Sequence, residues 1–183
     1  MIKKYILFVI SAISAISFLP LILGCTSSNN IKNDLVSMDK QQMISEADIR
    51  KLIYDHIKGI RNKDLEGVMS IYAKDIVSFD IDPPLWYKGI KAKREAWANV
   101  FEMYYHKIDY EIHDLGITVD GDIAFSHSLN HISGTMKDGH RSDIWLRWTA
   151  CFRKINGNWL VTHEQVSVPV DFKTGKALLD LKP

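Results

Sequence analysis

From Lys107 onwards the sequence alternates apolar and polar residues, and turn residues interrupt the alternation three times. The interruptions are Asp120-Gly121-Asp122, Lys137-Asp138-Gly139 and Asn156-Gly157. A period of two residues is typical of β-strands, and Asn-Gly between two such runs is a strong hairpin signal. The second half of the chain is therefore predicted to form three successive hairpins of an antiparallel sheet.

The first half of the folded region shows helical spacing instead. A first helix is predicted to begin near Ser45, and its buried face carries Ile49, Leu52, Ile53, Ile57 and Ile60. His56 falls on this face, either as a core histidine satisfied by one hydrogen bond or as an imidazole that lines a pocket. Asp64 is expected to cap a short second helix. A third helix is predicted from about Lys91 to Tyr105, with Lys93 on its solvent side.

Between the second and third helices, a strand period brings Asp80 to the start of a loop. Pro83-Pro84 ends any regular ladder there, because neither proline can donate a hydrogen bond. Helices followed by strands give an α+β order. We expect three N-terminal helices in the concave face of a strongly curved antiparallel sheet, with His56 and Asp80 in the cavity of this cone and Trp86 and Tyr87 at its rim.

The N-terminus is predicted to be a targeting segment. Lys3-Lys4 precede an uncharged run from Tyr5 to Leu23, and Ile22-Leu23-Gly24-Cys25 resembles the lipobox of bacterial lipoproteins. The alternatives are an uncleaved signal anchor and, as the weakest option, a core helix. The first two place the domain on a membrane of the cell envelope, outside the cytoplasm, with Cys25 as the lipidated residue in the first. The expected division is a signal peptide at 1–24, a flexible tether at 25–44 and a domain at 45–183.

Composition excludes several classes of function. The 183 residues carry a formal net charge of +1 without a cluster of basic residues, which argues against a nucleic-acid partner. With Cys25 lipidated, Cys151 is left as a packed, inert thiol and no disulfide framework is possible. His127 and His131 lie ~13 Å apart along one strand face, too far for one metal ion. We expect neither a metal nor a cofactor.

The segment from Asn62 to Gly89, the three hairpins and the pattern Asn156-Gly157-Asn158-Trp159-Leu160-Val161-Thr162-His163 resemble a known family. They are similar to the SnoaL-like, ketosteroid-isomerase-like group of the nuclear transport factor 2-like superfamily, over about Ser45 to Val168. The resemblance implies the cone-shaped fold. It does not fix the function, because this superfamily includes isomerases, cyclases, dehydratases and non-catalytic binding modules.

Position by position, the resemblance places Asp80 at the isomerase's general base and His56 at its oxyanion-stabilising tyrosine. Ala150 takes the place of the second oxyanion donor, and an alanine cannot donate. If Ala150 faces inward, Trp148 and Glu164 line the cavity, which is the frame we favour. A slip of one residue would bring in Arg147 and His163 instead.

Two functions are compatible with these residues. The first is a membrane-tethered module that binds a small, mainly apolar or carbonyl-bearing molecule. The alternative is a cofactor-independent proton-transfer enzyme of isomerase, dehydratase or cyclase type, with Asp80 as base and His56 as acid or oxyanion donor. The resemblance also implies a homodimer formed through the outer face of the sheet. The expected ligand-binding residues are Trp86, Tyr87, Trp148, Glu164, His127 and His163.

Overall fold

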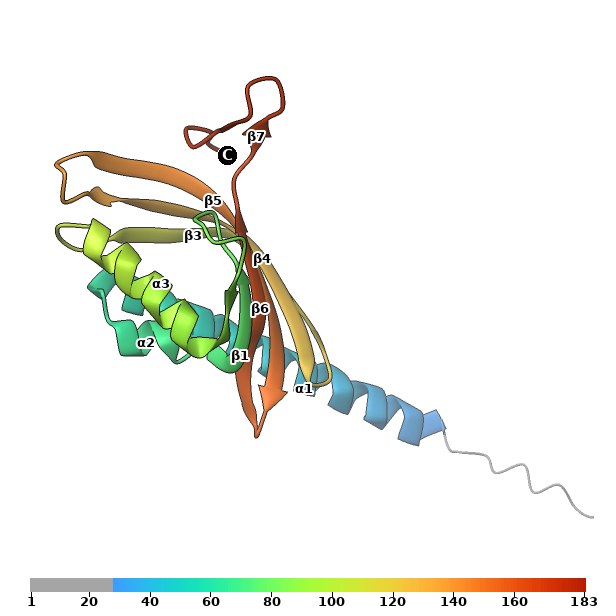
Figure 1. The fold of residues 1–183 in the computed structure, drawn as a ribbon. Helices are drawn as coiled ribbons and strands as arrows, with labels where there is room; N and C mark the ends of the chain where they lie inside the picture. The colour runs from blue at the N-terminus through green and yellow to red at the C-terminus, as the bar shows by residue number, and fades with distance from the viewer. Residues whose placement is uncertain (1–27) are drawn as a thin grey trace, which may run out of the picture.

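The computed structural model describes residues 28–183 of the chain (Figure 1). The predicted signal peptide and Cys25 lie outside the described residues. The three helices and the first two strands are α1 (Ser28–Asn62), α2 (Leu65–Met69), β1 (Tyr72–Phe79), β2 (Tyr87–Lys88) and α3 (Gly89–Met103). The remaining strands are β3 (Asp109–Asp120), β4 (Ile123–Thr135), β5 (Arg141–Ile155), β6 (Asn158–Ser167), β7 (Val170–Asp171) and β8 (Lys176–Ala177).

Six strands form one curved sheet in the order β2-β1-β6-β5-β4-β3. The three predicted hairpins join β3 to β4, β4 to β5 and β5 to β6, and all three pairs are antiparallel. Strand β1, however, pairs with β6 in parallel, so the sheet is mixed and the prediction of a purely antiparallel sheet is wrong. The hairpin turns specify only neighbours in sequence, whereas a helix and three hairpins separate β1 from β6 along the chain.

The helices cover the concave face of this sheet (Figure 1). The predicted buried face of α1 is confirmed, because Ile49, Ile53 and Ile60 are fully buried in the hydrophobic core. Helix α2 begins as expected, with the Asp64 carboxylate accepting a hydrogen bond from the Gly67 N–H. Packing of the apolar helix stripes against the sheet holds the α+β fold together.

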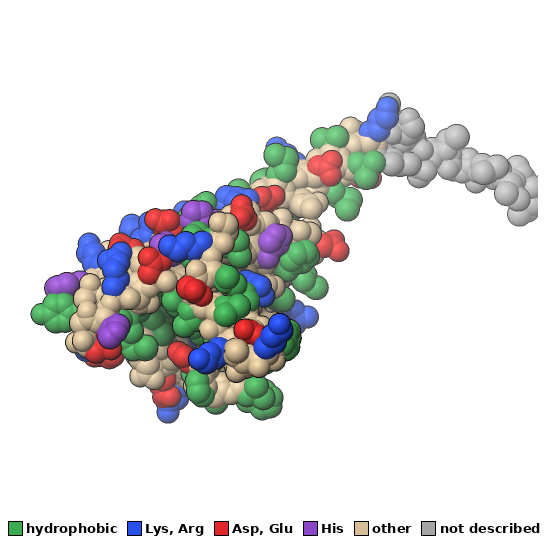
Figure 2. All heavy atoms as spheres, turned by 90° about the horizontal axis from the view of Figure 1, so that it is seen from above, with side chains coloured by type: hydrophobic (Ala, Val, Ile, Leu, Met, Phe, Trp, Pro, Cys, Tyr) green, Lys and Arg blue, Asp and Glu red, His purple; other side chains and the backbone are tan. Residues whose placement is uncertain are grey.

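Helix α1 begins at Ser28, well before the predicted start near Ser45. The flexible tether expected at 25–44 is therefore helical from residue 28. This segment contains no glycine or proline to end the helix. Residues 32–44 are exposed, and Figure 2 shows this part of α1 extending beyond the rounded body, where basic and acidic side chains are interspersed. Within residues 28–183, no helix is both long and apolar enough to cross a membrane.

The C-terminal tail follows β6 and forms a small hairpin of β7 and β8 above the sheet (Figure 1). The apolar residues of the tail predict that it docks on the sheet edge through Phe172, Leu178, Leu179 and Leu181. The Phe172 side chain is instead 99% exposed, because it lies in the turn between the two strands. Leu181 does approach the sheet, where it lines a surface hollow together with Trp145 and Leu146.

Candidate functional site

A cavity of about 100 Å³ lies between α3 and the concave face of the sheet. Its apolar walls come from Ile81, Ala96, Trp97, Val100, Leu146, Trp148 and Val166. Its polar groups are His56, Asp80, Asp82, Lys93, Tyr110, Asn130 and Glu164. For scale, an engineered apolar cavity of about 150 Å³ in another protein binds benzene. A small ring, or the inner end of a larger molecule, fits this volume.

Strand register decides which side chains reach the cavity. Ala150 pairs with Glu164 and Trp148 with Val166, and all four side chains lie on the concave side of the sheet. The neighbouring residues of both strands point to the convex side. The structure thus has the frame in which Ala150 faces inward, and both Trp148 and Glu164 line the cavity.

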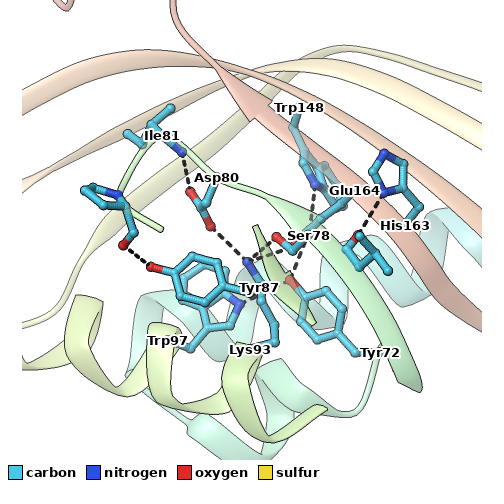
Figure 3. Close-up of polar contacts among 12 residues, drawn as sticks. Tyr72, Ser78, Asp80, Ile81, Tyr87, Lys93, Trp97, Trp148, His163 and Glu164 are labelled. Atoms are coloured by element: carbon cyan, nitrogen blue, oxygen red, sulfur yellow. Dashed lines mark hydrogen bonds and ion pairs between the residues drawn. The ribbon is translucent and has the colours of Figure 1, made fainter. Parts of the chain in front are cut away.

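The strongest electrostatic feature of the cavity is a buried ion pair. Lys93 Nζ, from α3, lies 2.6 Å from Glu164 Oε1, from β6 (Figure 3). The ammonium also donates to Asp80 Oδ2 at 3.0 Å and to Ser78 Oγ at 3.1 Å. These three acceptors match the three N–H donors of a lysine. The Lys93 charge is therefore fully compensated inside the protein.

Glu164 is satisfied just as completely. Its Oε1 also accepts from Ser78 Oγ, and its Oε2 accepts from Trp148 Nε1 at 2.9 Å and from the Tyr72 hydroxyl at 3.2 Å. Burial alone would raise the pKa of Glu164, but the charge and hydrogen bond of Lys93 outweigh burial and hold that pKa below its usual value. Glu164 is thus a buried, ionised carboxylate.

Asp80 follows the end of β1, where its side chain lines the cavity beside Lys93. Its Oδ1 accepts a hydrogen bond from the Ile81 N–H, and its Oδ2 accepts from Lys93. The side chain is 22% exposed, in contrast to the deeply buried Glu164. Asp80 therefore stands between the buried ion pair and the solvent.

His56 also lines the cavity, from α1, and it contacts three aromatic rings: Tyr72, Trp97 and Trp148. Burial lowers the pKa of His56 from 6.5 to about 4, so the imidazole is neutral at pH 7. Its Nδ1 lies 3.1 Å from the Val68 carbonyl oxygen, which can only accept, so Nδ1 carries the proton. Nε2 is left as an acceptor. The expectation of a protonated, donating His56 is wrong for this reason.

Trp86 and Tyr87 do not line the cavity, contrary to the prediction. The Trp86 side chain is 47% exposed, and Lys88 Nζ lies 4.2 Å from its ring centroid. The Tyr87 hydroxyl, on β2, donates to the Pro83 carbonyl oxygen in the preceding loop. Both side chains thus make local contacts, and neither is among the residues that line the cavity.

His127 and His163 lie outside the cavity as well, because each faces the convex side of its strand. His127 is exposed beside a separate surface hollow that Arg147 also lines. His163 donates from Nδ1 to the Val77 carbonyl oxygen at 2.8 Å, and its ring packs on Phe79. Sequence alternation alone separates His163 from the inward-facing Glu164.

Lys93, Ser78 and Tyr72 were missed as members of the site. We placed Lys93 on the solvent side of its helix, yet its side chain is only 3% exposed. A signal was available, since Lys93 precedes Ala96 and Trp97 by three and four residues and so shares their helix face. Ser78 lies two residues before Asp80 on the same strand face, which could also have indicated it.

Within the described residues, no group of three or more histidine, cysteine, aspartate or glutamate side chains is arranged to hold a metal ion. The cationic partner of the carboxylates is Lys93. The chemistry open to a ligand is therefore that of the neutral His56 Nε2, the partly exposed Asp80 carboxylate and the Tyr110–Asn130 side of the cavity.

Comparison with solved structures places this fold among known ones. A crystal structure of an NTF2-like protein of unknown function from Pseudomonas putida matches 77% of this chain and 98% of its own, with 34% identity and a TM-score of 0.71. A ketosteroid isomerase-like protein from Erwinia carotovora atroseptica matches 66% of this chain and 93% of its own, with 23% identity and a TM-score of 0.58.

A hexachlorocyclohexane dehydrochlorinase of the LinA type from Novosphingobium barchaimii matches 68% of this chain and 86% of its own, at 18% identity and a TM-score of 0.61. At this level of identity the likeness is one of fold. No curated protein matches the chain. The model of the SnoaL-like domain, in contrast, matches residues 49–171. The chain therefore belongs to the SnoaL-like domain family and is an NTF2-like protein.

Proposed function

We propose that this domain binds a small, neutral, mainly apolar molecule in the cavity between α3 and the sheet. Apolar walls with a few convergent polar groups are the usual features of a small-molecule site. The observation that carries the proposal is that the two deeply buried charges, Lys93 and Glu164, neutralise each other, while Asp80 is partly exposed to solvent. A charged ligand would disturb this balance, whereas a neutral one leaves it intact.

The test fills the cavity with a larger side chain at a position of α3 that lines it. Val100 lines the cavity, while its neighbour Asn99 is exposed on the same helix. Calorimetry and thermal-shift assays with small neutral carbonyl compounds should detect binding to the wild type and to Asn99→Phe, and none to Val100→Phe. Equal binding by both variants would show that the ligand occupies a different surface.

A proton-transfer enzyme is the second candidate, supported by the bare Nε2 of His56, which lines the same cavity as Asp80. The fold also occurs in a hexachlorocyclohexane dehydrochlorinase and a ketosteroid isomerase-like protein. In this function Asp80 or His56 accepts a proton from carbon next to a carbonyl. We rank it second because a general base works best with a pKa near the working pH, and burial lowers the pKa of His56 to about 4.

Deuterium exchange distinguishes the two candidates. Cyclohexanone incubated with the protein in heavy water would gain deuterium next to its carbonyl group if the C–H proton passes to a base and a solvent deuteron replaces it. If the protein is an enzyme, the wild type should exchange faster than the buffer alone, and this exchange should decrease in Asp80→Asn and in His56→Gln. A pure binding module requires binding with exchange at the buffer rate.

We further propose that the domain is anchored to a membrane of the cell envelope, facing outside the cytoplasm, through lipid on Cys25. The support is the sequence before Cys25, which combines a basic start, an apolar run and a preceding glycine. Cys25→Ser should release the protein from the membrane fraction, and Cys151→Ser should not. Retention of both variants in the membrane fraction would favour an uncleaved anchor.

Dimerisation through the convex face of the sheet is also a proposal. Ile123 and Phe125 on β4 are 58% and 47% exposed there, and exposed apolar side chains are typical of interfaces when they lie together. Light scattering should give a dimer for the wild type and a monomer for Phe125→Lys. Leu85→Lys, at an exposed loop position, is the matched control and should remain dimeric.

A further inference from the structure

One polar side of the cavity is not explained by the ion pair. Tyr110, on β3, and Asn130, on β4, both line the cavity, and their side chains are 8% and 1% exposed. Within residues 28–183, neither side chain forms a hydrogen bond with Lys93 or Glu164. Buried polar groups are usually satisfied, so an incomplete set of partners at this place needs an explanation.

The hydrogen bonds on this side run in one direction, towards the tyrosine. Ser128 Oγ donates to Asn130 Oδ1 at 2.8 Å, and Asn130 Nδ2 donates to the Tyr110 hydroxyl oxygen at 2.7 Å. All three side chains lie on the concave face of the sheet. Hydrogen bonds arranged head to tail polarise one another, which strengthens the last donor of the series. That last donor is the Tyr110 O–H, and no acceptor for it is found among the described residues.

The other donors of the cavity are already committed. Lys93 uses its three N–H groups on Glu164, Asp80 and Ser78. The remaining donors are Trp148 to Glu164, Trp97 to Tyr72, and His56 to the Val68 carbonyl oxygen. This leaves the Tyr110 hydroxyl and one N–H of Asn130, and of these two cavity-lining residues Tyr110 is the more solvent-accessible.

The hydroxyl keeps its proton under all ordinary conditions. Burial raises the pKa of Tyr110 well above its usual value, despite the opposing hydrogen bond from Asn130. Tyr110 therefore acts as a neutral donor at any pH at which the domain is folded. Its natural counterpart is a neutral acceptor atom, since a neutral group leaves the buried Lys93–Glu164 pair undisturbed.

We propose that Tyr110 donates a hydrogen bond to the carbonyl oxygen of the bound molecule, and that the Ser128–Asn130 pair orients this donor. The site thereby selects neutral carbonyl compounds over hydrocarbons of the same shape. This inference rests on the proposed binding function and adds the group that determines specificity. A site built to hydrogen-bond its ligand discriminates against an analogue that leaves the buried donor unpaired.

Two probes of the same shape test this selection. Cyclohexanone and methylenecyclohexane differ only in the replacement of the carbonyl oxygen by a CH₂ group. We expect the wild type to bind cyclohexanone about tenfold more tightly, the typical contribution of one buried hydrogen bond. Tyr110→Phe should bind both probes alike. The carbonyl stretching band of bound cyclohexanone should also lie at lower frequency in the wild type than in Tyr110→Phe.

The matched control is Tyr104→Phe. Tyr104 is also buried, and its hydroxyl donates to Ser142 Oγ instead of facing the cavity, so its loss should leave the tenfold preference unchanged. Ser128→Ala tests the relay and should reduce the preference without changing the cavity wall. Circular dichroism and thermal unfolding establish that each variant is folded.

The outcomes separate the two proposals. If the wild type binds both probes alike, and Tyr110→Phe does the same, the role of Tyr110 is overturned while the binding function stands. If neither probe binds the wild type, the proposed function itself is overturned, and the inference about Tyr110 falls with it. A preference that survives in Tyr110→Phe would assign the donor to a different group.

Discussion

Lys93 Nζ and Glu164 Oε1 lie 2.6 Å apart in the protein interior and join helix α3 to strand β6 across the cavity wall. Burial alone would lower the pKa of Lys93, but the charges of Glu164 and Asp80 outweigh burial and raise it. Each partner thus keeps the other ionised. A pair of this kind contributes little relative to two apolar side chains, but the loss of one partner is costly.

We therefore predict that Lys93→Met lowers the free energy of unfolding by about 3–5 kcal/mol, because Glu164 is left as an unpaired buried charge. Urea denaturation at pH 7 measures this loss. Lys91→Met, at an exposed position of the same helix, should change it by less than about 0.5 kcal/mol. The double variant Lys93→Met/Glu164→Gln should recover much of the loss. A double variant as unstable as the single one would contradict this explanation.

The pH dependence of stability should reveal His56. Its pKa is 6.5 in the unfolded chain and about 4 in the folded protein, so between these values the unfolded state binds the extra proton. Stability is therefore complete above pH 6.5 and falls as the pH decreases towards 4, by up to about 3 kcal/mol. His56→Gln should remove this slope from urea denaturation measured at pH 7.5, 5.5 and 4.5.

The exposed His127 provides the control for this experiment, since His127→Gln should keep the wild-type slope. Glu164 adds a second loss at lower pH. Its folded pKa lies below its usual value of 4.5, so its contribution is present above that value and disappears as the pH falls through the folded pKa. A wild type equally stable at pH 7.5 and pH 4.5 would disprove the assignment of His56.

Local sequence signals predicted the parts of the fold that depend on neighbouring residues. The turn at Asn156-Gly157 required positive φ angles that these residues tolerate, and both have them in the structure. The cap at Asp64 and the buried stripe of α1 are equally local. The parallel pairing of β1 with β6 was not predictable in this way, because no turn connects the two strands.

The candidate site shows the same division. Strand alternation was sufficient to choose Glu164 over His163 once Ala150 was assumed to face inward. The position of Lys93 was misjudged because charged neighbours on α3 suggested a solvent-facing residue, although its spacing to Trp97 fits the buried stripe. A buried lysine is stable only beside carboxylates, and those come from β6 and the end of β1, far away in sequence.

Asp80→Asn separates a structural role of this carboxylate from a chemical one. The amide oxygen can still accept the hydrogen bond of Lys93, and the side chain is partly exposed, so we expect a loss of stability of about 1 kcal/mol or less. Deuterium exchange into cyclohexanone, if the wild type shows it, should fall to the buffer rate because an amide cannot serve as the base. Asp82→Asn also alters the cavity wall and should keep the exchange. A domain that unfolds on Asp80→Asn would make the role structural.

Trp148 contacts both Glu164 of the ion pair and His56. Replacing it tests whether Glu164 depends on the hydrogen bond from Trp148. Its Nε1–H donates to Glu164 Oε2 at 2.9 Å, and its ring stacks on His56 with centroids 6.1 Å apart. Trp148→Phe keeps a ring but removes a hydrogen bond to a charged group, which contributes about 1.5–3 kcal/mol. Urea denaturation followed by circular dichroism should show a loss of this size. Trp145→Phe, on the convex face against His131, should cost about 1 kcal/mol or less. Equal losses in the two variants would mean that Trp148 contributes only its packing and that Glu164 does not depend on its N–H.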